Sequence, residues 1–381
     1  MYLPPKFDMN DAMLKTFKVK TVLAVLVIAL RVPAQQVQPV NDPYNMLVLG
    51  DSITWGQGLK KENKTWYHVK TWIERTLGRP VLERVEAHSG AVIDGGPPRQ
   101  MKLPRDGEVN LGFPSIYEEV DNALRFYSDR SRVDLVLISG CGNDVGTQTF
   151  LNAQSSNELN RMTEQKCKPL MEQLLRRVTT AFPVAQVIVV GYYPFFSEQT
   201  PKDFVTKALA RSLYSTTTPN AKVHSKEIFE RLAANSREWY EASDEALSSA
   251  VQTINSEIGT KRVAFAKIDF LPEYSFATKE TRLWEFDRSP FRMLLMFLSL
   301  GKIRLTTNDE VRGARGLSCR DFYTAVPGET TSQKKERENR RALCRYAALG
   351  HPNKKGATLY ANAIIDALKR TLAAKANSPQ P

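Results

Sequence analysis

The 381-residue chain contains few of the residues that most often build metal and redox sites. It has only four histidines and four cysteines, and no two cysteines form a C-x-x-C pair. It also lacks an apolar run of the roughly 20 residues that a membrane-spanning helix needs. These absences argue against a metalloenzyme, a dithiol oxidoreductase and a polytopic membrane protein. We therefore expect neither a bound metal nor a cofactor.

An apolar run near the N-terminus is typical of a secretory signal peptide. Lysines at positions 15, 18 and 20 precede a ten-residue apolar run at 21–30, and small residues up to Ala34 follow it. We predict that residues 1–34 are removed and that the protein is secreted or periplasmic, with an uncleaved membrane anchor as the alternative. The whole chain is 42% hydrophobic and 25% charged, which is typical of a globular protein.

All four cysteines lie beyond the predicted signal peptide, at positions Cys141, Cys167, Cys319 and Cys344. In an oxidising compartment an even number of cysteines predicts disulfides, and four cysteines can pair in three ways. We favour a disulfide between Cys319 and Cys344, because it would close the long polar segment before His351. For Cys141, at the end of an apolar strand, a buried free thiol is the alternative to a disulfide.

The chain is basic, with a formal net charge of +12. Beyond residue 34 it keeps 48 basic and 39 acidic residues, a net charge of +9. Such a balance favours adsorption to anionic surfaces such as cell envelopes. We expect no nucleic-acid partner, because no basic stripe with interleaved aromatic residues and no nucleic-acid-binding motif is present. We expect a monomer that acts on an ester substrate, for the reasons below.

Short apolar, β-branched segments alternate along the chain with longer segments of helical periodicity. Strands are predicted at 46–49, 81–85, 133–138, 187–190 and 263–268, and helices at 66–77, 115–127, 157–182, 235–258 and 355–374. This alternation predicts an α/β fold with a parallel sheet of about five strands, covered by helices on both faces.

Two stretches do not fit the alternation within the domain expected at 45–373. Residues 198–234 are polar with helical pieces and are interpreted as an insertion, and residues 271–349 are long and irregular. The apolar run at 290–300 is interpreted as a buried helix, with an acyl pocket or a lid as alternatives. Residues 374–381 are expected to form a disordered tail.

Small and polar motifs follow three successive predicted strands. Gly50-Asp51-Ser52 follows the first, Ser89-Gly90 the second and Gly142-Asn143-Asp144 the third, while His351 opens the last helix. Ligands of parallel α/β sheets bind beyond the carboxyl ends of the strands, so these motifs are predicted to meet there. We expect the two aspartates to brace their loops by hydrogen bonds.

A serine hydroxyl becomes a useful nucleophile only when an adjacent base accepts its proton. Of the four histidines, His351 has the best context for this task, because its loop can reach across the strand ends. His88, close to Gly90, is a second candidate for a role at the site. The Gly90 backbone N–H and the Asn143 amide are suited to hold a developing oxyanion.

Taken together, the four motifs resemble the four blocks of the GDSL/SGNH hydrolase family, which is named for serine, glycine, asparagine and histidine. The resemblance extends from residue 46 to about residue 372. It implies a flavodoxin-like three-layer α/β/α sandwich and ester hydrolysis through an acyl-enzyme. It assigns Ser52 as the nucleophile, His351 as its base, and Gly90 and Asn143 to the oxyanion hole. The implied substrates are esters of carbohydrate, cell-wall material or lipid.

The chain departs from this family at two positions. The family usually has an acid three residues before the histidine, where this chain has Ala348, so either a backbone carbonyl orients His351 or Asp321 or Asp287 reaches it. Cys141 replaces a family glycine two residues before the asparagine, and we expect this small residue to be tolerated. Because orientation of the base matters for catalysis, a catalytically weakened binding module is the alternative function.

Overall fold

Five parallel strands form one sheet in a computed structural model that describes residues 42–95, 114–146, 151, 156–214, 225–290 and 305–376. The strands are β1 (Tyr44–Leu49), β2 (Val81–Val85), β3 (Val133–Ile138), β4 (Gln186–Val190) and β5 (Val263–Ala266). All five predicted strands are confirmed, with boundaries shifted by no more than two residues. Their order in the sheet is β2-β1-β3-β4-β5.

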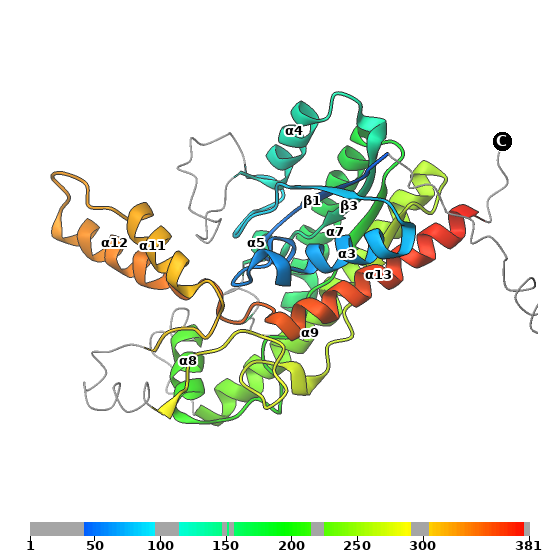
Figure 1. Ribbon diagram of the computed structural model, residues 1–381. Helices are drawn as coiled ribbons and strands as arrows, with labels where there is room; N and C mark the ends of the chain where they lie inside the picture. The colour runs from blue at the N-terminus through cyan, green and yellow to red at the C-terminus, as the bar shows by residue number, and fades with distance from the viewer. Residues whose placement is uncertain are drawn as a thin grey trace, which may run out of the picture. The chain divides into compact units, whose positions relative to one another are not determined.

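Helices cover both faces of the sheet (Figure 1). Helices α3 and α13 lie on one face, and α4, α7 and α9 lie on the other. The described helices are α2 (Ser52–Trp55), α3 (Thr65–Leu77), α4 (Ile116–Phe126), α5 (Gly142–Val145), α7 (Ser156–Ala181), α8 (Phe204–Tyr214), α9 (Ser225–Ile258), α11 (Arg312–Phe322), α12 (Thr331–Cys344) and α13 (Lys354–Ala376). The predicted three-layer α/β/α sandwich is therefore confirmed.

The burial of each strand follows from its place in the sheet. All six residues of β1 and all five of β4 are buried, because neighbouring strands and helices cover them on every side. Strands buried on both faces read as continuous apolar runs, and each buried Leu, Ile or Val side chain contributes roughly 1.5–3 kcal/mol. The edge strand β2 alternates with charge and is largely half-exposed, as its sequence predicts.

The strand order fixes where a ligand can bind. The chain leaves β1 towards one edge of the sheet, returns past β1 and continues through β3, β4 and β5 to the other edge. The crevice of such a sheet opens where the order reverses, here between the carboxyl ends of β1 and β3. Ser52 follows β1 and Asn143 lies close behind β3, so both residues stand at this point.

The segment expected to be an insertion contains two helices. Residues 204–214 form α8, and α9 begins at Ser225, ten residues before the predicted start at Asn235. Ile228, Phe229 and Leu232 are buried at helical spacing in this first part of α9. Their pattern was present in the sequence, but the surrounding charges obscured it.

The long segment before His351 is also more regular than predicted, because it contains α11 and α12. The predicted disulfide between Cys319 and Cys344 joins these two helices and is confirmed. Cys141 is bonded to Cys167, so the buried free thiol considered for Cys141 is wrong. Helix α7 passes the end of β3 and brings the two Cα atoms within 5.0 Å of each other.

Three predicted features fall wholly or largely outside the described residues: the signal peptide at 1–34, the apolar run at 290–300 and the tail at 374–381. Of the tail, residues 374–376 belong to α13. Within the described part of the chain, no helix combines the length and the apolar character that crossing a membrane requires.

Candidate active site

The tight turn after β1 presents Ser52 at the first position of α2. Asp51 caps this helix by accepting a hydrogen bond from the backbone N–H of Ile53 at 2.9 Å. Gly50 has φ +116°, and a Cβ atom there would overlap the carbonyl oxygen of Ser139. Only glycine fits at this position, and its turn directs Ser52 out of the sheet.

His351 meets Ser52 although 299 residues separate them in the sequence. Its Nε2 atom lies 2.8 Å from the Ser52 hydroxyl oxygen. The loop that carries it is held on both sides of the histidine. The Trp284 N–H donates to the carbonyl of His351 at 2.7 Å, and the Gly350 N–H donates to the carbonyl of Trp284 at 2.8 Å. The Tyr193 hydroxyl donates to the carbonyl of Gly350 at 2.7 Å.

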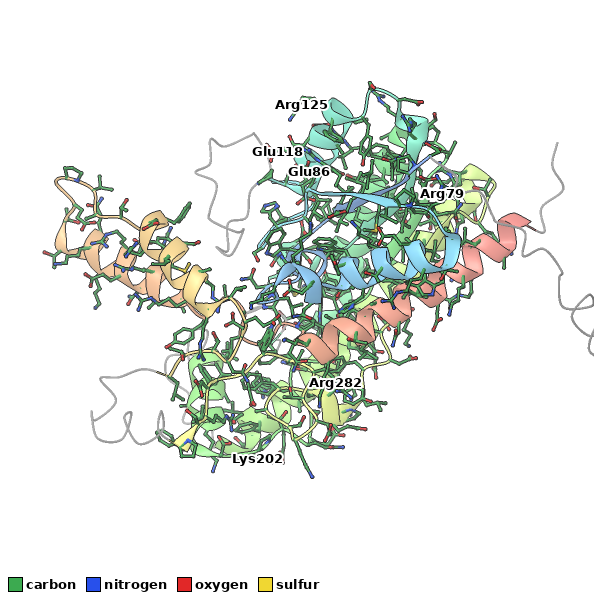
Figure 2. The ribbon with its side chains drawn as sticks, in the orientation of Figure 1. Arg79, Glu86, Glu118, Arg125, Lys202 and Arg282 are labelled. Atoms are coloured by element: carbon green, nitrogen blue, oxygen red, sulfur yellow. A yellow bond between two sulfur atoms is a disulfide. The ribbon has the colours of Figure 1, made fainter. Side chains whose placement is uncertain are left out.

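The contact between these two segments continues towards α13. Leu283 and Pro352 form an antiparallel bridge, and the Asn353 N–H donates to the carbonyl of Arg282 at 2.8 Å. Figure 2 labels Arg282 in this region. The Asn353 side chain also donates to the carbonyl of Thr281 at 3.1 Å. Residues 281–284, which were predicted to be irregular, therefore hold the histidine loop in place.

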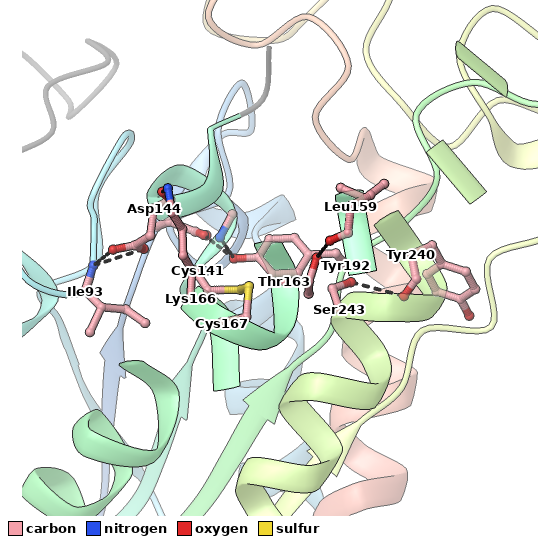
Figure 3. The surroundings of a disulfide bond; sticks show 12 residues. Ile93, Cys141, Asp144, Leu159, Thr163, Lys166, Cys167, Tyr192, Tyr240 and Ser243 are labelled. Carbon is pink, nitrogen blue, oxygen red and sulfur yellow. Dashed lines mark hydrogen bonds between the residues drawn. A yellow bond between two sulfur atoms is a disulfide. The ribbon is translucent and has the colours of Figure 1, made fainter. Parts of the chain in front are cut away.

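The loops after β2 and β3 are joined beside Ser52. The Asn143 amide donates to the carbonyl of Ala91 at 2.9 Å, which places it next to Gly90 and leaves its second N–H for another acceptor. Asp144 accepts from the Ile93 N–H at 3.0 Å, as Figure 3 shows. Burial raises the pKa of Asp144 to about 6. The predicted bracing role of this carboxyl group is confirmed.

Asp51 braces the same region from below. Its carboxylate accepts from the Ser139 hydroxyl at 2.6 Å and from the Tyr192 hydroxyl at 2.8 Å. Tyr192 in turn accepts from the Gly142 N–H at 2.8 Å. This chain of bonds ties the turn after β1 to the loops after β3 and β4. The structure thus brings the four predicted site residues to one end of the sheet.

The sequence profile of the GDSL-like lipase/acylhydrolase family matches residues 48–245. The chain belongs to this family. The match includes Ser52, Gly90 and Asn143, whereas His351 lies beyond it. Lipases and acylhydrolases cleave esters, so the family places this protein among the ester hydrolases in general.

Several solved structures resemble the chain at low identity. An extracellular lipase from Streptomyces rimosus and a phospholipase A1 from Streptomyces albidoflavus are each 15% identical, with TM-scores of 0.37, and each comparison covers 65% of this chain and 89% of the other. A psychrotrophic esterase from Pseudoalteromonas is 12% identical, with a TM-score of 0.33 over 86% of this chain and 98% of the other. No significant match was found among curated proteins.

Ala348, at the position of the usual GDSL acid, lies in apolar surroundings. It is fully buried in a cluster with Leu59, Trp284 and Ala357. A Cβ atom built on Gly58 would lie 2.8 Å from the Ala348 methyl group and equally close to the Trp284 indole nitrogen. The chain at Gly58 therefore packs directly against Ala348, and the cluster contains no carboxylate.

The two acids considered as substitutes are engaged elsewhere. Asp287 accepts from Arg312 at 3.1 Å, and Asp321 accepts from its neighbour Arg320 at 3.1 Å. Neither carboxylate contacts His351. Its Nδ1 atom is buried and has no hydrogen-bond partner of good geometry among the described residues.

The surroundings of His351 disfavour its charged form. Burial and the positive charge of Arg315 lower the pKa of His351 to about 4, against the smaller opposing effect of the carbonyls of Ala348, Leu349 and Ala347. Arg315 is fully buried and pairs with Asp309, whose side chain is also fully buried. The imidazole is therefore neutral at pH 7 and can accept a proton at Nε2.

Cys141, at the family's glycine position, keeps the backbone conformation that glycine favours. Its φ is +92°, which is a strained value for any residue with a side chain. The disulfide to Cys167 on α7 anchors it immediately before Gly142 and Asn143. Figure 3 shows this bond beside the loop that carries Asp144.

The sequence reasoning missed Glu119, which lies directly behind the nucleophile turn. Its side chain is fully buried, accepts from the Gly50 N–H at 2.6 Å and pairs with Nδ1 of His88 at 2.8 Å. Burial raises the pKa of Glu119 well above its usual range. Its place on the apolar face of α4, between Ile116 and Ala123, was the signal that could have identified it.

Proposed function

We propose that the protein hydrolyses carboxylic esters through a covalent acyl-enzyme, with Ser52 as nucleophile and His351 as general base. The distance of 2.8 Å between Nε2 of His351 and the Ser52 hydroxyl carries this proposal. It is the contact that an activated serine needs. The lowered pKa of His351 supports it, because the base stays unprotonated at neutral pH.

The reaction proceeds in two halves. The Ser52 oxygen attacks the ester carbonyl carbon while Nε2 of His351 takes the hydroxyl proton, and a tetrahedral intermediate forms. Its collapse breaks the bond to the alcohol, which leaves with the proton from His351. A water molecule then attacks the acyl-enzyme and gives a proton to His351. When this second intermediate collapses, the bond to the Ser52 oxygen breaks, His351 returns the proton to that oxygen, and the carboxylic acid is released.

Three N–H groups are proposed to hold the negative oxygen of the intermediate. They are the backbone N–H groups of Ser52 and Gly90 and the second amide N–H of Asn143. The hydrogen bond from Asn143 to Ala91 supports this proposal, because it fixes the amide beside Gly90. Loss of one such donor typically costs about 3–4 kcal/mol of transition-state stabilisation.

We propose that backbone carbonyls of residues 347–349 orient the imidazole of His351. They lie close enough to Nδ1 to raise the pKa, and Ala348 provides no side-chain acceptor. A carbonyl fixes the ring but adds no full negative charge to stabilise the imidazolium. Turnover is accordingly expected to be slower than with a carboxylate in this position.

We further propose that the protein is exported as a monomer after removal of residues 1–34, and that its substrate is an ester of carbohydrate, cell-wall material or lipid. Two disulfides are consistent with an oxidising, extracellular compartment. Mass spectrometry of the native protein should find an N-terminus near Gln35. An intact N-terminal segment in the mature protein would contradict cleavage.

The test of the catalytic assignment is hydrolysis of p-nitrophenyl acetate by a Ser52→Ala variant. We expect activity to fall to background while the free energy of unfolding changes by about 1 kcal/mol or less, because Ser52 is half-buried and its hydroxyl donates only to His351. If Ser52→Ala keeps most of the activity, Ser52 is not the nucleophile.

A second function is favoured by the apolar cluster around Ala348 and the cation next to His351. Both features weaken the base, as expected for a binding module that keeps the fold but has little catalytic power. A fluorophosphonate probe separates the two functions. Covalent labelling of Ser52 supports the hydrolase, and absence of labelling in folded protein supports the binding module.

A further inference from the structure

The helical hairpin formed by α11 and α12 is not used by the proposed mechanism. Its two helices lie side by side, are joined by the disulfide between Cys319 and Cys344, and immediately precede the His351 loop (Figure 1). Along α12, Cys344 is the one buried residue. A capping box at Thr330 and the disulfide stabilise this polar helix, which would be marginal by itself.

Positive charge is concentrated in this hairpin. Residues 312–345 contain nine basic and four acidic residues, a net charge of +5, whereas the whole chain after residue 34 carries +9. Arg337 and Arg340 pair with Glu329 and Glu336. Four other cations form no ion pair with the described residues: Lys334, Lys335, Arg341 and Arg345.

Three of these cations lie on one face of the α12 segment, together with the acidic residue Glu338. Arg341 and Arg345 follow Lys334 by 7 and 11 positions, a spacing that brings all three to one face of the α12 segment. Lys335 is the next residue after Lys334 in the sequence. Lys334, Lys335 and Arg345 are exposed. Figure 2 shows side chains standing out from the hairpin. A linear anion could follow this face over about 16 Å, at 1.5 Å per residue.

The hairpin also carries a hollow of about 490 Å³. It is lined by Tyr323, Gln333 and the two ion pairs Arg337–Glu329 and Arg340–Glu336, with residues 326–328 completing the wall. Planar guanidinium and amide groups bind hydroxyl and carboxylate oxygens, and a tyrosine offers an apolar ring face with a polar tip. Sugar rings present this combination of hydroxyl groups and apolar faces.

The base of the hairpin reaches the proposed active site. Arg315 of α11 donates to the carbonyl of Arg345 at 3.1 Å, at the point where the chain leaves α12 for the histidine loop. His351 follows Cys344 by seven residues. A polymer held along α12 would run from the hollow, at the end of the hairpin formed by the loop between the two helices, towards the loop that carries His351.

We propose that the α11–α12 hairpin binds an anionic polysaccharide and holds it next to the Ser52–His351 centre. The inference rests on the proposed esterase function, and it narrows the substrate to esters carried on an acidic carbohydrate polymer. The basic face binds the negative groups of the polymer, and the hollow takes a sugar unit. A lipid surface fits less well, because the exposed large apolar residues of the hairpin, Leu317, Val326 and Leu343, are divided between the two helices and the loop that joins them. An interfacial helix needs a whole apolar face.

The test measures binding of full-length protein to polygalacturonate, a linear polyuronate, by isothermal titration calorimetry. The Ser52→Ala variant is the parent for all binding measurements, so binding is followed without hydrolysis. One variant combines Lys334→Gln, Lys335→Gln and Arg345→Gln. Its matched control combines Lys207→Gln, Lys261→Gln and Lys279→Gln, which removes three exposed charges outside the hairpin. A third variant, Tyr323→Ala, probes the hollow.

We expect the hairpin charge variant and Tyr323→Ala to weaken binding by about tenfold or more, and the control to weaken it by less than twofold. With Ser52 intact, the same substitutions should leave hydrolysis of p-nitrophenyl acetate within twofold, which separates failure of docking from failure of the esterase proposal. Equal losses in the hairpin variant and the control would overturn the proposal. So would tight binding to phosphatidylglycerol vesicles without binding to polygalacturonate.

Discussion

At the scale of single residues, the proposed active site pairs Ser52 with a histidine whose surroundings disfavour its charged form. His351 contacts Ser52 through Nε2, but its other nitrogen faces a backbone turn where GDSL enzymes usually have a carboxylate. The positive charge of Arg315 disfavours the imidazolium. His351 is consequently neutral over a wide pH range, but its surroundings do little to stabilise the imidazolium that forms when it takes up a proton.

This arrangement predicts an unusually acid-tolerant enzyme. The base works only when neutral, and a pKa of about 4 keeps His351 neutral at every pH well above 4. An enzyme whose histidine had the ordinary pKa of about 6.5 would lose activity about 2.5 pH units higher. The profile of kcat/KM against pH should therefore show its acid limb near pH 4. An acid limb near 6.5 would mean that His351 does not experience the surroundings described above.

The Ala348→Asp variant is the matched control for this profile. A carboxylate at this position stabilises the imidazolium, so the acid limb should move to higher pH. The variant should also be less stable, because the new charge is buried against Gly58 and Trp284. A limb that stays near pH 4 in folded Ala348→Asp protein would show that residue 348 is electrostatically remote from the base.

Glu119 is expected to position the nucleophile turn. A Glu119→Gln variant removes the acidic group and leaves one acceptor oxygen for the contacts with the Gly50 N–H and with Nδ1 of His88. We expect kcat on a soluble ester to fall by about tenfold with KM nearly unchanged. Glu118→Gln is the control, because Gln can keep the capping box of α4 at this position. Equal kcat values for both variants would remove the positioning role.

At the scale of elements, each catalytic loop is held by a different neighbour. The turn after β1 is held through Asp51 and Glu119, the loops after β2 and β3 are joined to each other, and the His351 loop pairs with residues 281–284. Site geometry therefore depends on several separate contacts rather than on one. Local changes should alter activity before they unfold the domain.

The disulfide at α5 permits a direct measurement of backbone strain. Two variants, Cys141→Gly with Cys167→Ala and Cys141→Ala with Cys167→Ala, both lose the 26-residue cross-link, which costs about 3 kcal/mol. The glycine variant should be the more stable by about 1 kcal/mol, because φ +92° strains alanine but not glycine. Urea unfolding gives both values. Equal stability would show that the loop relaxes to negative φ once the disulfide is gone.

At the scale of the whole molecule, two disulfides cross-link segments outside the sheet. One ties the loop before Asn143 to α7, and the other closes the α11–α12 hairpin. Each disulfide closes a loop of about 25 residues and so restricts the conformations of the unfolded chain. Both disulfides are consistent with a compartment where thiols are oxidised.

Oxidation state should therefore control the stability of the whole protein. Protein made in an oxidising compartment should expose no reactive thiols when it is denatured, and protein made under reducing conditions should expose four. We expect the reduced form to melt about 5–10 °C lower. Thiol titration in denaturant and thermal unfolding measure both effects. Four reactive thiols in the exported protein would contradict the disulfide assignment.

Much of the fold was determined by local sequence. The strands were predictable because buried parallel strands need continuous apolar, β-branched runs, which are visible in one segment at a time. Ser52, Gly90 and Asn143 could be placed because each follows a strand, and the ends of parallel strands meet at one edge. The disulfide between Cys319 and Cys344 was predictable from its position around a polar segment.

Tertiary structure alone decided what surrounds the base. The pairing of the His351 loop with residues 281–284, the cation of Arg315 and the partner of Cys141 all depend on segments that are distant in sequence. Periodicity reports which face of an element is buried, but not which element covers it. The sequence alone showed that Ala348 stands where the family usually has an acid. Only the folded chain showed that a packed apolar cluster takes its place, because that cluster is assembled from four separate stretches.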